Sequence, residues 1–300
     1  ASKKAVSEKA APKKAVKKTV AKTAPLAKKT IKKAASKLVK KTEQNVSGYG
    51  SGGVDVVMSV DQVAKEAASI AAAAPTIKEL EKLVPGDVYL SINDLRAGYG
   101  KMEILHEFSL RIGQGQSLCL IGPNGAGKST VLHSIFGFTN IFSGSIMVNG
   151  KDVTSLTPSQ KLSEAGIAYI LQDKSVFPQM TVEENLLMGG FLKDKPAEAK
   201  AAAEMVFDKY SRLADRRNKP AGVLSGGERR LLEISRALVM QPQVLLVDEP
   251  SIGLEPRFID MVFEILEDLQ HKDGKTIIMV EQNAKKGLSF ADTGYVMVSG

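Results

Sequence analysis

The 300-residue chain has no tryptophan, one cysteine and three histidines, and aromatic residues make up only 5% of it. A single cysteine cannot form an intrachain disulfide, so we interpret Cys119, which lies in an apolar stretch, as a small core residue of a protein in a reducing compartment. The histidines, His106, His133 and His271, do not have the spacing of metal ligands, and we expect ordinary surface or loop residues. No apolar run reaches the length of a membrane-spanning helix.

Acidic residues are scarce at the start of the chain. Residues 1–43 hold fifteen lysines and two glutamates, a charge of about +13, whereas the remainder carries a net charge of −5. The overall +8 therefore belongs to this segment and does not indicate a basic globular domain. Because large apolar residues are also few, we expect residues 1–53 to form a disordered basic tail that ends in a Gly/Ser linker. The tail has no apolar core typical of a signal peptide, and the first arginine, Arg96, argues against an organellar transit peptide.

Within the tail, apolar residues at helical spacing predict a short basic amphipathic helix: Ile31, Ala34, Ala35, Leu38 and Val39. Such a helix would suit an anionic lipid surface, and the lysines would suit nucleic acid through counterion release. These two functional alternatives stand beside the simpler interpretation, a disordered solubilising extension with no specific partner. Residues 54–87 are expected to form a short helical connector, in which Ser59 and Thr76 each begin a capping box.

The clearest motif is Gly-Pro-Asn-Gly-Ala-Gly-Lys-Ser at residues 122–129. It follows the apolar residues 118–121, which predict a buried strand, and precedes residues 131–136, whose apolar positions have helical spacing. Glycines let backbone N–H groups turn towards a phosphate, and the helix N-terminus also favours an anion. In this motif the lysine reaches the β- and γ-phosphates and the hydroxyl binds magnesium. We therefore expect a nucleotide site made of Gly122, Pro123, Asn124, Gly125, Ala126, Gly127, Lys128, Ser129 and Thr130, in which Lys128 also serves catalysis and Ser129 the metal.

A second apolar run, residues 244–247, ends in two carboxylates, Asp248 and Glu249. Four consecutive apolar residues predict a central parallel strand buried on both faces, and ligands bind at the carboxyl ends of such strands. Asp248 suits the magnesium shell, directly or through water. Glu249 suits the general base that orients and deprotonates an attacking water. In isolation these residues would favour an ordinary strand-ending turn, but the phosphate loop upstream favours the catalytic interpretation.

A third motif, Leu-Ser-Gly-Gly-Glu at residues 224–228, precedes a predicted helix over residues 229–240. A serine and two glycines at a helix N-terminus make a second anion site. The three motifs in this order resemble those of the ATP-binding cassette (ABC) ATPases, and the resemblance extends from about residue 88 to the end. It implies an α/β P-loop NTPase core at residues 88–300 with a mainly helical subdomain at about 173–221. It also implies that Ser225, Gly226 and Gly227 close on a nucleotide held by another subunit.

The resemblance assigns further residues individually. Tyr99 lies where the family places an aromatic residue that stacks on adenine, although an ordinary surface or core tyrosine is the alternative. Gln172 matches the glutamine that contacts magnesium and the attacking water. Glu255 belongs to a segment that resembles the loop at the dimer interface. Gln282, after the strand predicted at 276–280, takes the place of the histidine that contacts the γ-phosphate. A glutamine there implies a slower site and a different partner subunit that retains the histidine.

Residues 248–254, 280–284 and 292–296 resemble one branch in particular, the ATP-binding subunits of branched-chain amino-acid importers, whose close relatives serve urea and amides. The resemblance implies ATP hydrolysis with Mg²⁺, coupled to uptake through membrane permease subunits and, indirectly, a solute-binding protein. It implies a cytoplasmic subunit, peripheral on the inner face of the cell membrane, that forms a heterodimer with a second ABC ATPase subunit. The alternative is a soluble ABC ATPase acting on nucleic acid or ribosomes, but the two cassettes or long coiled-coil insertion usual in such proteins are not found.

The segment after Gln172, residues 174–184, is where we expect contact with the permease. Phe177, Pro178 and Met180 are apolar residues in an otherwise exposed loop, as a groove that receives a permease helix requires. The alternative is that these residues pack the two subdomains together.

Overall fold

The computed structural model describes residues 76–84, 86–172, 175–298 and 300. The expectations for the basic tail, its linker and the capping box at Ser59 lie outside these residues. The described part begins with helix α3 (Ile77–Glu81), where the Thr76 N–H donates to the Glu79 carboxylate at 2.8 Å. The capping box predicted at Thr76 is therefore confirmed.

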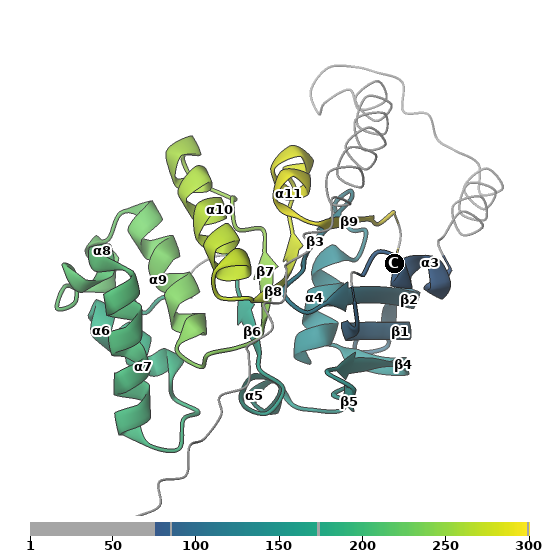
Figure 1. Ribbon diagram of the computed structural model, residues 1–300, viewed down its shortest axis with the longest axis horizontal. Helices are drawn as coiled ribbons and strands as arrows, with labels where there is room; N and C mark the ends of the chain where they lie inside the picture. Colours follow the sequence, from purple (N-terminus) through teal and green to yellow (C-terminus); the bar gives the residue numbers. More distant parts are fainter. Residues whose placement is uncertain (1–75, 85, 173–174, 299) are drawn as a thin grey trace, which may run out of the picture. The chain divides into compact units, whose positions relative to one another are not determined.

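Two sheets form the framework of the molecule (Figure 1). The first is antiparallel, has the strand order β2-β1-β4-β5, and consists of β1 (Val88–Tyr99), β2 (Met102–Gly113), β4 (Asn140–Val148) and β5 (Lys151–Asp152). The second is parallel, has the order β6-β7-β8-β3-β9, and consists of β3 (Ser117–Ile121), β6 (Ile167–Ile170), β7 (Val244–Asp248), β8 (Thr276–Val280) and β9 (Thr293–Val296).

The parallel sheet explains the uninterrupted apolar runs of the sequence. β3, β7 and β8 are buried at every position because helices cover both faces of the sheet. Helix α4 (Lys128–Phe136) shares one apolar cluster with both sheets, and α10 (Pro256–His271) and α11 (Ala284–Phe290) pack on the other face of the parallel sheet. Cys119 lies in this second cluster, where burial raises the pKa of its thiol to about 12, so the prediction of a buried core cysteine is confirmed. The strands predicted at 118–121, 244–247 and 276–280 are confirmed as well.

A group of helices lies on the side of the parallel sheet away from β1, β2 and β4 (Figure 1). It comprises α6 (Val182–Gly189), α7 (Pro196–Lys209), α8 (Ser211–Ala214), a 3₁₀ turn (Ala221–Val223) and α9 (Gly226–Leu238), which share a third apolar cluster. The short helix α5 (Pro158–Ser163) precedes β6. The helical subdomain boundaries at about 173–221 stay a prediction.

The helical stretch of residues 196–214 is interrupted at one residue. The chain leaves the helical conformation at Tyr210 (φ −126°, ψ 83°), which ends α7 and precedes α8. The Tyr210 ring is half-buried against the third cluster, and Leu213 N–H starts a new turn by donating to the Tyr210 carbonyl at 2.9 Å. Packing of this ring therefore outweighs the local helical pattern.

Candidate functional site

The glycine-rich loop connects β3 to α4. Gly122 and Gly127 have φ values of 152° and 89°, and a Cβ atom at Gly122 would lie 2.2 Å from the Met297 carbonyl oxygen. Glycine is therefore required there both by the backbone angle and by the space available. Lys128 is buried, and its ammonium group donates to the carbonyls of Gly122 and Pro123 at 2.9 Å each. Within the described residues this ammonium has no carboxylate partner, so its charge is available to an anion bound in the loop.

The end of β7 brings a carboxylate to this loop. The Ser129 hydroxyl donates to Asp248 Oδ1 at 3.2 Å, so two of the three predicted metal ligands lie side by side. Asp248 Oδ2 accepts a hydrogen bond from the Tyr169 hydroxyl at 2.8 Å. Burial and the neighbouring Asp248 carboxylate raise the pKa of Tyr169, so this tyrosine remains a proton donor. Both oxygens of Asp248 are thereby oriented, one towards Ser129 and one towards Tyr169.

Glu249 is the meeting point of two predicted glutamines. Gln172 Nε2 donates to Glu249 Oε2 and Gln282 Nε2 donates to Glu249 Oε1, each at 2.9 Å. The carboxylate is 8% exposed, and Glu249 has a φ of 43°, which is unfavourable for a residue with a side chain. Its N–H donates to the Val280 carbonyl at 2.9 Å, which helps to maintain this conformation at the end of β7. Such local strain is common at functional sites, where the surrounding structure maintains it.

The Ser-Gly-Gly motif forms the start of α9. The Ser225 N–H donates to the Glu228 carboxylate at 2.9 Å, and the Glu228 N–H donates to the Ser225 hydroxyl at 3.3 Å, which completes a capping box. Gly227 is buried against Phe258, whose ring a Cβ atom would approach to 2.2 Å. Among the described residues, no hydrogen bond joins this motif to the glycine-rich loop. The structure thus brings together one group of predicted site residues and leaves the Ser-Gly-Gly motif in a second group.

A cavity of about 490 Å³ extends between Gln172 and the start of α9. Its lining includes residues from three of the predicted segments: Gln172, Gly226, Arg229, Arg230, Glu233, Ile252, Gly253 and Leu254. Arg230 and Glu233 are both buried and form an ion pair at 2.8 Å. Arg230 also donates to the Leu171 carbonyl at 2.7 Å, so it connects α9 to the residue before Gln172.

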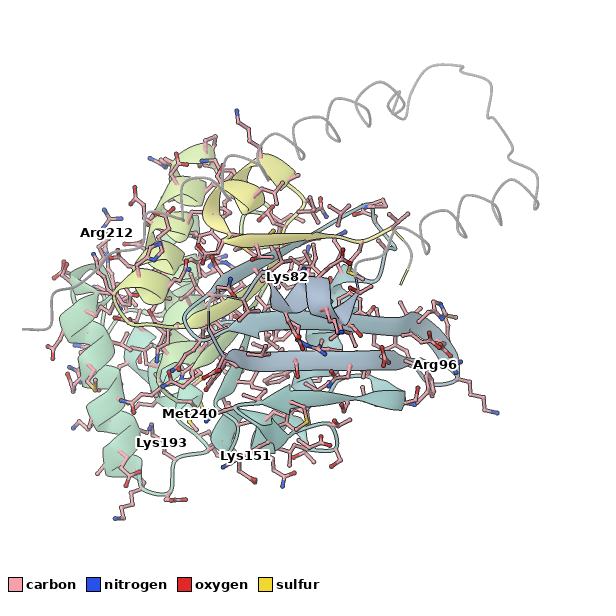
Figure 2. All side chains as sticks on the ribbon, turned by 45° about the vertical axis from the view of Figure 1, so that its right-hand side comes forward. Lys82, Arg96, Lys151, Lys193, Arg212 and Met240 are labelled. Atoms are coloured by element: carbon pink, nitrogen blue, oxygen red, sulfur yellow. The ribbon has the colours of Figure 1, made fainter. Side chains whose placement is uncertain are left out.

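Tyr99 ends β1 and is 43% exposed. Figure 2 labels Arg96, which pairs with Glu103 at 2.8 Å, at this end of the antiparallel sheet. The Tyr99 hydroxyl is hydrogen-bonded to Nδ1 of His133. His133 is half-buried in α4, where burial lowers the pKa of its imidazole. The expectation of a surface or loop residue is therefore wrong for His133, because α4 passes between the two sheets; His106 and His271 are exposed.

Phe177 and Pro178 are exposed, whereas Met180 is half-buried. The loop that contains them is held by Asn185 of α6, which is fully buried. Asn185 Oδ1 accepts a hydrogen bond from the Phe177 N–H at 2.8 Å, and its Nδ2 donates to the Phe177 carbonyl at 2.9 Å. The guanidinium of Arg236 lies 5.0 Å from the centroid of the Phe177 ring.

Several residues of these sites were not predicted from the sequence, among them His133, Tyr169, Asn185 and Phe258. Two of them have a sequence signal that could have identified them. His133 follows Ser129 by four residues and so lies on the same face of α4, and Tyr169 precedes Gln172 at the end of a buried strand. No comparable signal marks Asn185 or Phe258.

None of the described helices combines the length and the apolar character needed to cross a bilayer.

A protein-family model described as ABC transporter matches residues 105–252. The chain is 42% identical over 211 residues to the high-affinity branched-chain amino acid transport ATP-binding protein BraG of Pseudomonas aeruginosa, an alignment covering 70% of this chain and 89% of that protein. It is 39% identical over 206 residues to the probable branched-chain amino acid transport ATP-binding protein LivF of Archaeoglobus fulgidus, covering 69% and 86%. It is 30% identical over 213 residues to the lipopolysaccharide export system ATP-binding protein LptB of Haemophilus influenzae, covering 70% and 87%.

Solved structures agree with these relatives. The ADP conformation of an ATP-binding cassette of an ABC transporter superposes with a TM-score of 0.64 at 28% identity, covering 72% of this chain and 90% of that chain. A nucleotide-free ATP-binding cassette gives a TM-score of 0.63 at 27% identity, covering 71% and 90%.

Proposed function

Since the chain belongs to the ATP-binding proteins of ABC transporters and is an ABC ATPase, we propose that it powers the uptake of branched-chain amino acids or of a related small polar solute such as urea or an amide. Two relatives named for branched-chain amino acid transport, at 42% and 39% identity, support this solute class. The relative named for lipopolysaccharide export is less similar, at 30% identity. A soluble ATPase acting on nucleic acid or ribosomes is not favoured by these relatives.

The observation that carries the catalytic proposal is the position of Glu249 between two amide donors. Gln172 and Gln282 each donate to a different oxygen of its carboxylate at 2.9 Å, which restricts the rotation of the carboxylate. A carboxylate oriented in this way can accept a proton from a water that attacks the γ-phosphate. Lys128 would contact the β- and γ-phosphates, while backbone N–H groups of the glycine-rich loop would surround the phosphate chain.

The residues present also fit a magnesium ion. Ser129 Oγ and Asp248 Oδ1 are oxygen donors 3.2 Å apart beside the phosphate loop, and hard cations prefer such ligands. When bound, Mg²⁺ would neutralise developing charge on the phosphate oxygens. Ser129 and Asp248 would hold the ion, and Gln172 is the third predicted ligand. Tyr169 would keep Asp248 turned towards Ser129 through its hydrogen bond at 2.8 Å.

We also propose that a second subunit completes the nucleotide-binding site. Ser225 is the N-cap of a helix of thirteen residues that begins with Gly226 and Gly227 and whose N-terminus attracts phosphate. No hydrogen bond of the described chain joins these residues to its own glycine-rich loop. A second ABC ATPase subunit that places its nucleotide against this motif accounts for the separation. The glutamine at position 282 supports a heterodimer, because its neutral amide cannot bring positive charge to the γ-phosphate as a protonated histidine can.

The proposed partners are permease subunits in the membrane and, indirectly, a solute-binding protein. With these partners the chain would lie at the cytoplasmic face of the membrane. The exposed Phe177 and Pro178 suit a surface that receives a permease helix.

For the basic tail we propose contact with anionic lipid, with nucleic acid as the rival ligand. Co-sedimentation with anionic vesicles, compared between the intact chain and a chain that begins at Gly53, tests the lipid contact, and equal binding of the two would refute it.

The direct test of the catalytic proposal is Glu249→Gln. Turnover should fall by about 10²- to 10⁴-fold, the usual contribution of a general base, while ATP binding survives. Glu264→Gln is the matched control, because Glu264 is an exposed carboxylate on α10. Phosphate release and ATP binding are measured for both variants. Hydrolysis by Glu249→Gln near the wild-type rate would show that another group activates the water.

A further inference from the structure

A continuous series of side-chain contacts joins Tyr99 to Asp248. The Tyr99 hydroxyl is hydrogen-bonded to Nδ1 of His133, and the two rings meet edge to face with centroids 6.0 Å apart. The His133 ring lies 5.7 Å from the Tyr169 ring, and the Tyr169 hydroxyl donates to Asp248 at 2.8 Å. The other side of His133 packs against Phe138, with ring centroids 5.7 Å apart. His133 is thus enclosed by three aromatic rings and joined to one of them by a hydrogen bond.

The position of His133 in α4 explains why the contacts reach the nucleotide site. Ser129 and His133 are four residues apart, so their side chains lie one above the other on the same face of the helix. Ser129 contacts Asp248 directly, at 3.2 Å, and His133 contacts Tyr169, which holds the other oxygen of Asp248. One face of the phosphate-loop helix therefore supports both the metal-binding carboxylate and Tyr99.

The hydrogen bond distinguishes this arrangement from simple packing. A phenylalanine at position 133 would satisfy the three ring contacts equally well, but it could not orient the Tyr99 hydroxyl. Tyr99 is 43% exposed, so few neighbouring atoms restrict its ring. The hydrogen bond from its hydroxyl group to His133 therefore sets the orientation of the ring. Aromatic stacking depends on the relative orientation of the rings, so an anchored tyrosine is better prepared for a base than a free one.

We infer that His133 is a positioning residue for the nucleotide base, which orients the Tyr99 ring through the Tyr99 hydroxyl. This inference rests on the proposed stacking of adenine on Tyr99. The Tyr99 hydroxyl then has a role separate from stacking, which is to hold the ring in one orientation. Removing the Tyr99 hydroxyl and removing the His133 imidazole then break the same hydrogen bond. Neither change should affect the binding of the phosphate chain alone.

The test compares ATP with tripolyphosphate, which lacks a base, by isothermal titration of the full-length protein in the presence of Mg²⁺. Tyr99→Phe and His133→Phe should each weaken ATP binding about three- to tenfold, the value of one net hydrogen bond, and the double variant should lose no more than either single variant. Tripolyphosphate affinity should not change. Tyr89→Phe is the control, because Tyr89 also lies on β1 and its hydroxyl has no hydrogen-bond partner in the part of the chain that the structure describes.

Three results would overturn the inference: wild-type ATP affinity of Tyr99→Phe, additive losses in the double variant, or an equal loss of tripolyphosphate binding. Tyr99→Ala separates this inference from the proposed stacking. If Tyr99→Ala weakens ATP binding and Tyr99→Phe does not, the ring stacks on adenine and His133 has no positioning role. If Tyr99→Ala binds ATP as the wild type does, the stacking proposal is wrong and the inference fails with it.

Discussion

Replacing Asn185 by leucine should loosen residues 177–181 while leaving the rest of the fold intact. Asn185 is fully buried, and its amide makes four hydrogen bonds to this loop: one from the Phe177 N–H and one each to the carbonyls of Phe177, Met180 and Thr181. Leucine has nearly the same size but can neither donate nor accept. Its apolar side chain suits the buried position, so we expect no large packing cost beyond that of the lost hydrogen bonds.

The local free-energy cost depends on which N–H and carbonyl groups of the loop keep another hydrogen-bond partner. The carbonyls of Met180 and Thr181 also accept hydrogen bonds from the N–H groups of Ala221 and Asn185, at 2.8 and 3.0 Å, and the Phe177 carbonyl accepts one from Met180 at 3.2 Å. Only the Phe177 N–H loses its sole partner in the described structure. One unpaired N–H costs about 1–3 kcal/mol, which corresponds to an opening equilibrium raised about 5- to 150-fold.

Hydrogen–deuterium exchange measures this opening directly. The Phe177 amide should exchange about 5- to 150-fold faster in Asn185→Leu, whereas peptides from α7 should exchange as in the wild type. Basal ATP hydrolysis should be unchanged, because Asn185 is hydrogen-bonded to no described side chain of the nucleotide site, and transport should weaken if the loop binds the permease. Unchanged exchange at Phe177 would refute the claim that Asn185 holds the loop.

Three further outcomes are expected. Phe177→Glu should uncouple transport from hydrolysis without lowering basal hydrolysis; unfolding in thermal melts would instead mean that Phe177 packs the subdomains together. Burial lowers the pKa of Lys161 from 10.5 to about 8, so the unfolded state binds more protons between these values and stability rises with pH across this range. Between pH 8 and pH 10 the free energy of unfolding in urea should rise by about 3 kcal/mol at most in the wild type, and Lys161→Met should lack this rise. The same pH slope in both proteins would disprove the contribution of Lys161. Gln282→His should preserve or raise ATP turnover, because imidazole can also donate to Glu249; a marked loss would reveal a role specific to the amide.

Much of this protein is determined by residues that are neighbours in sequence. The runs at 118–121, 244–247 and 276–280 predict β3, β7 and β8 because a strand buried on both faces needs apolar residues at every position. The glycine-rich loop and the capping box at Ser225 are recognisable for a similar reason, since their backbone angles and local hydrogen bonds depend on a few adjacent residues. These local patterns were sufficient to predict the α/β class, the family and the placement of Lys128 and Ser129.

The tertiary structure decided what depends on residues far apart in the chain. Gln172 and Gln282 approach Glu249 from two other strand ends, and no local pattern indicates that both amides donate to its carboxylate. Tyr210 interrupts a good helical pattern because its ring packs against neighbouring helices, and His133 is half-buried because α4 packs between the two sheets. In each case the energy comes from burial and hydrogen bonding between distant segments, which are set only when the sheets and helices pack together.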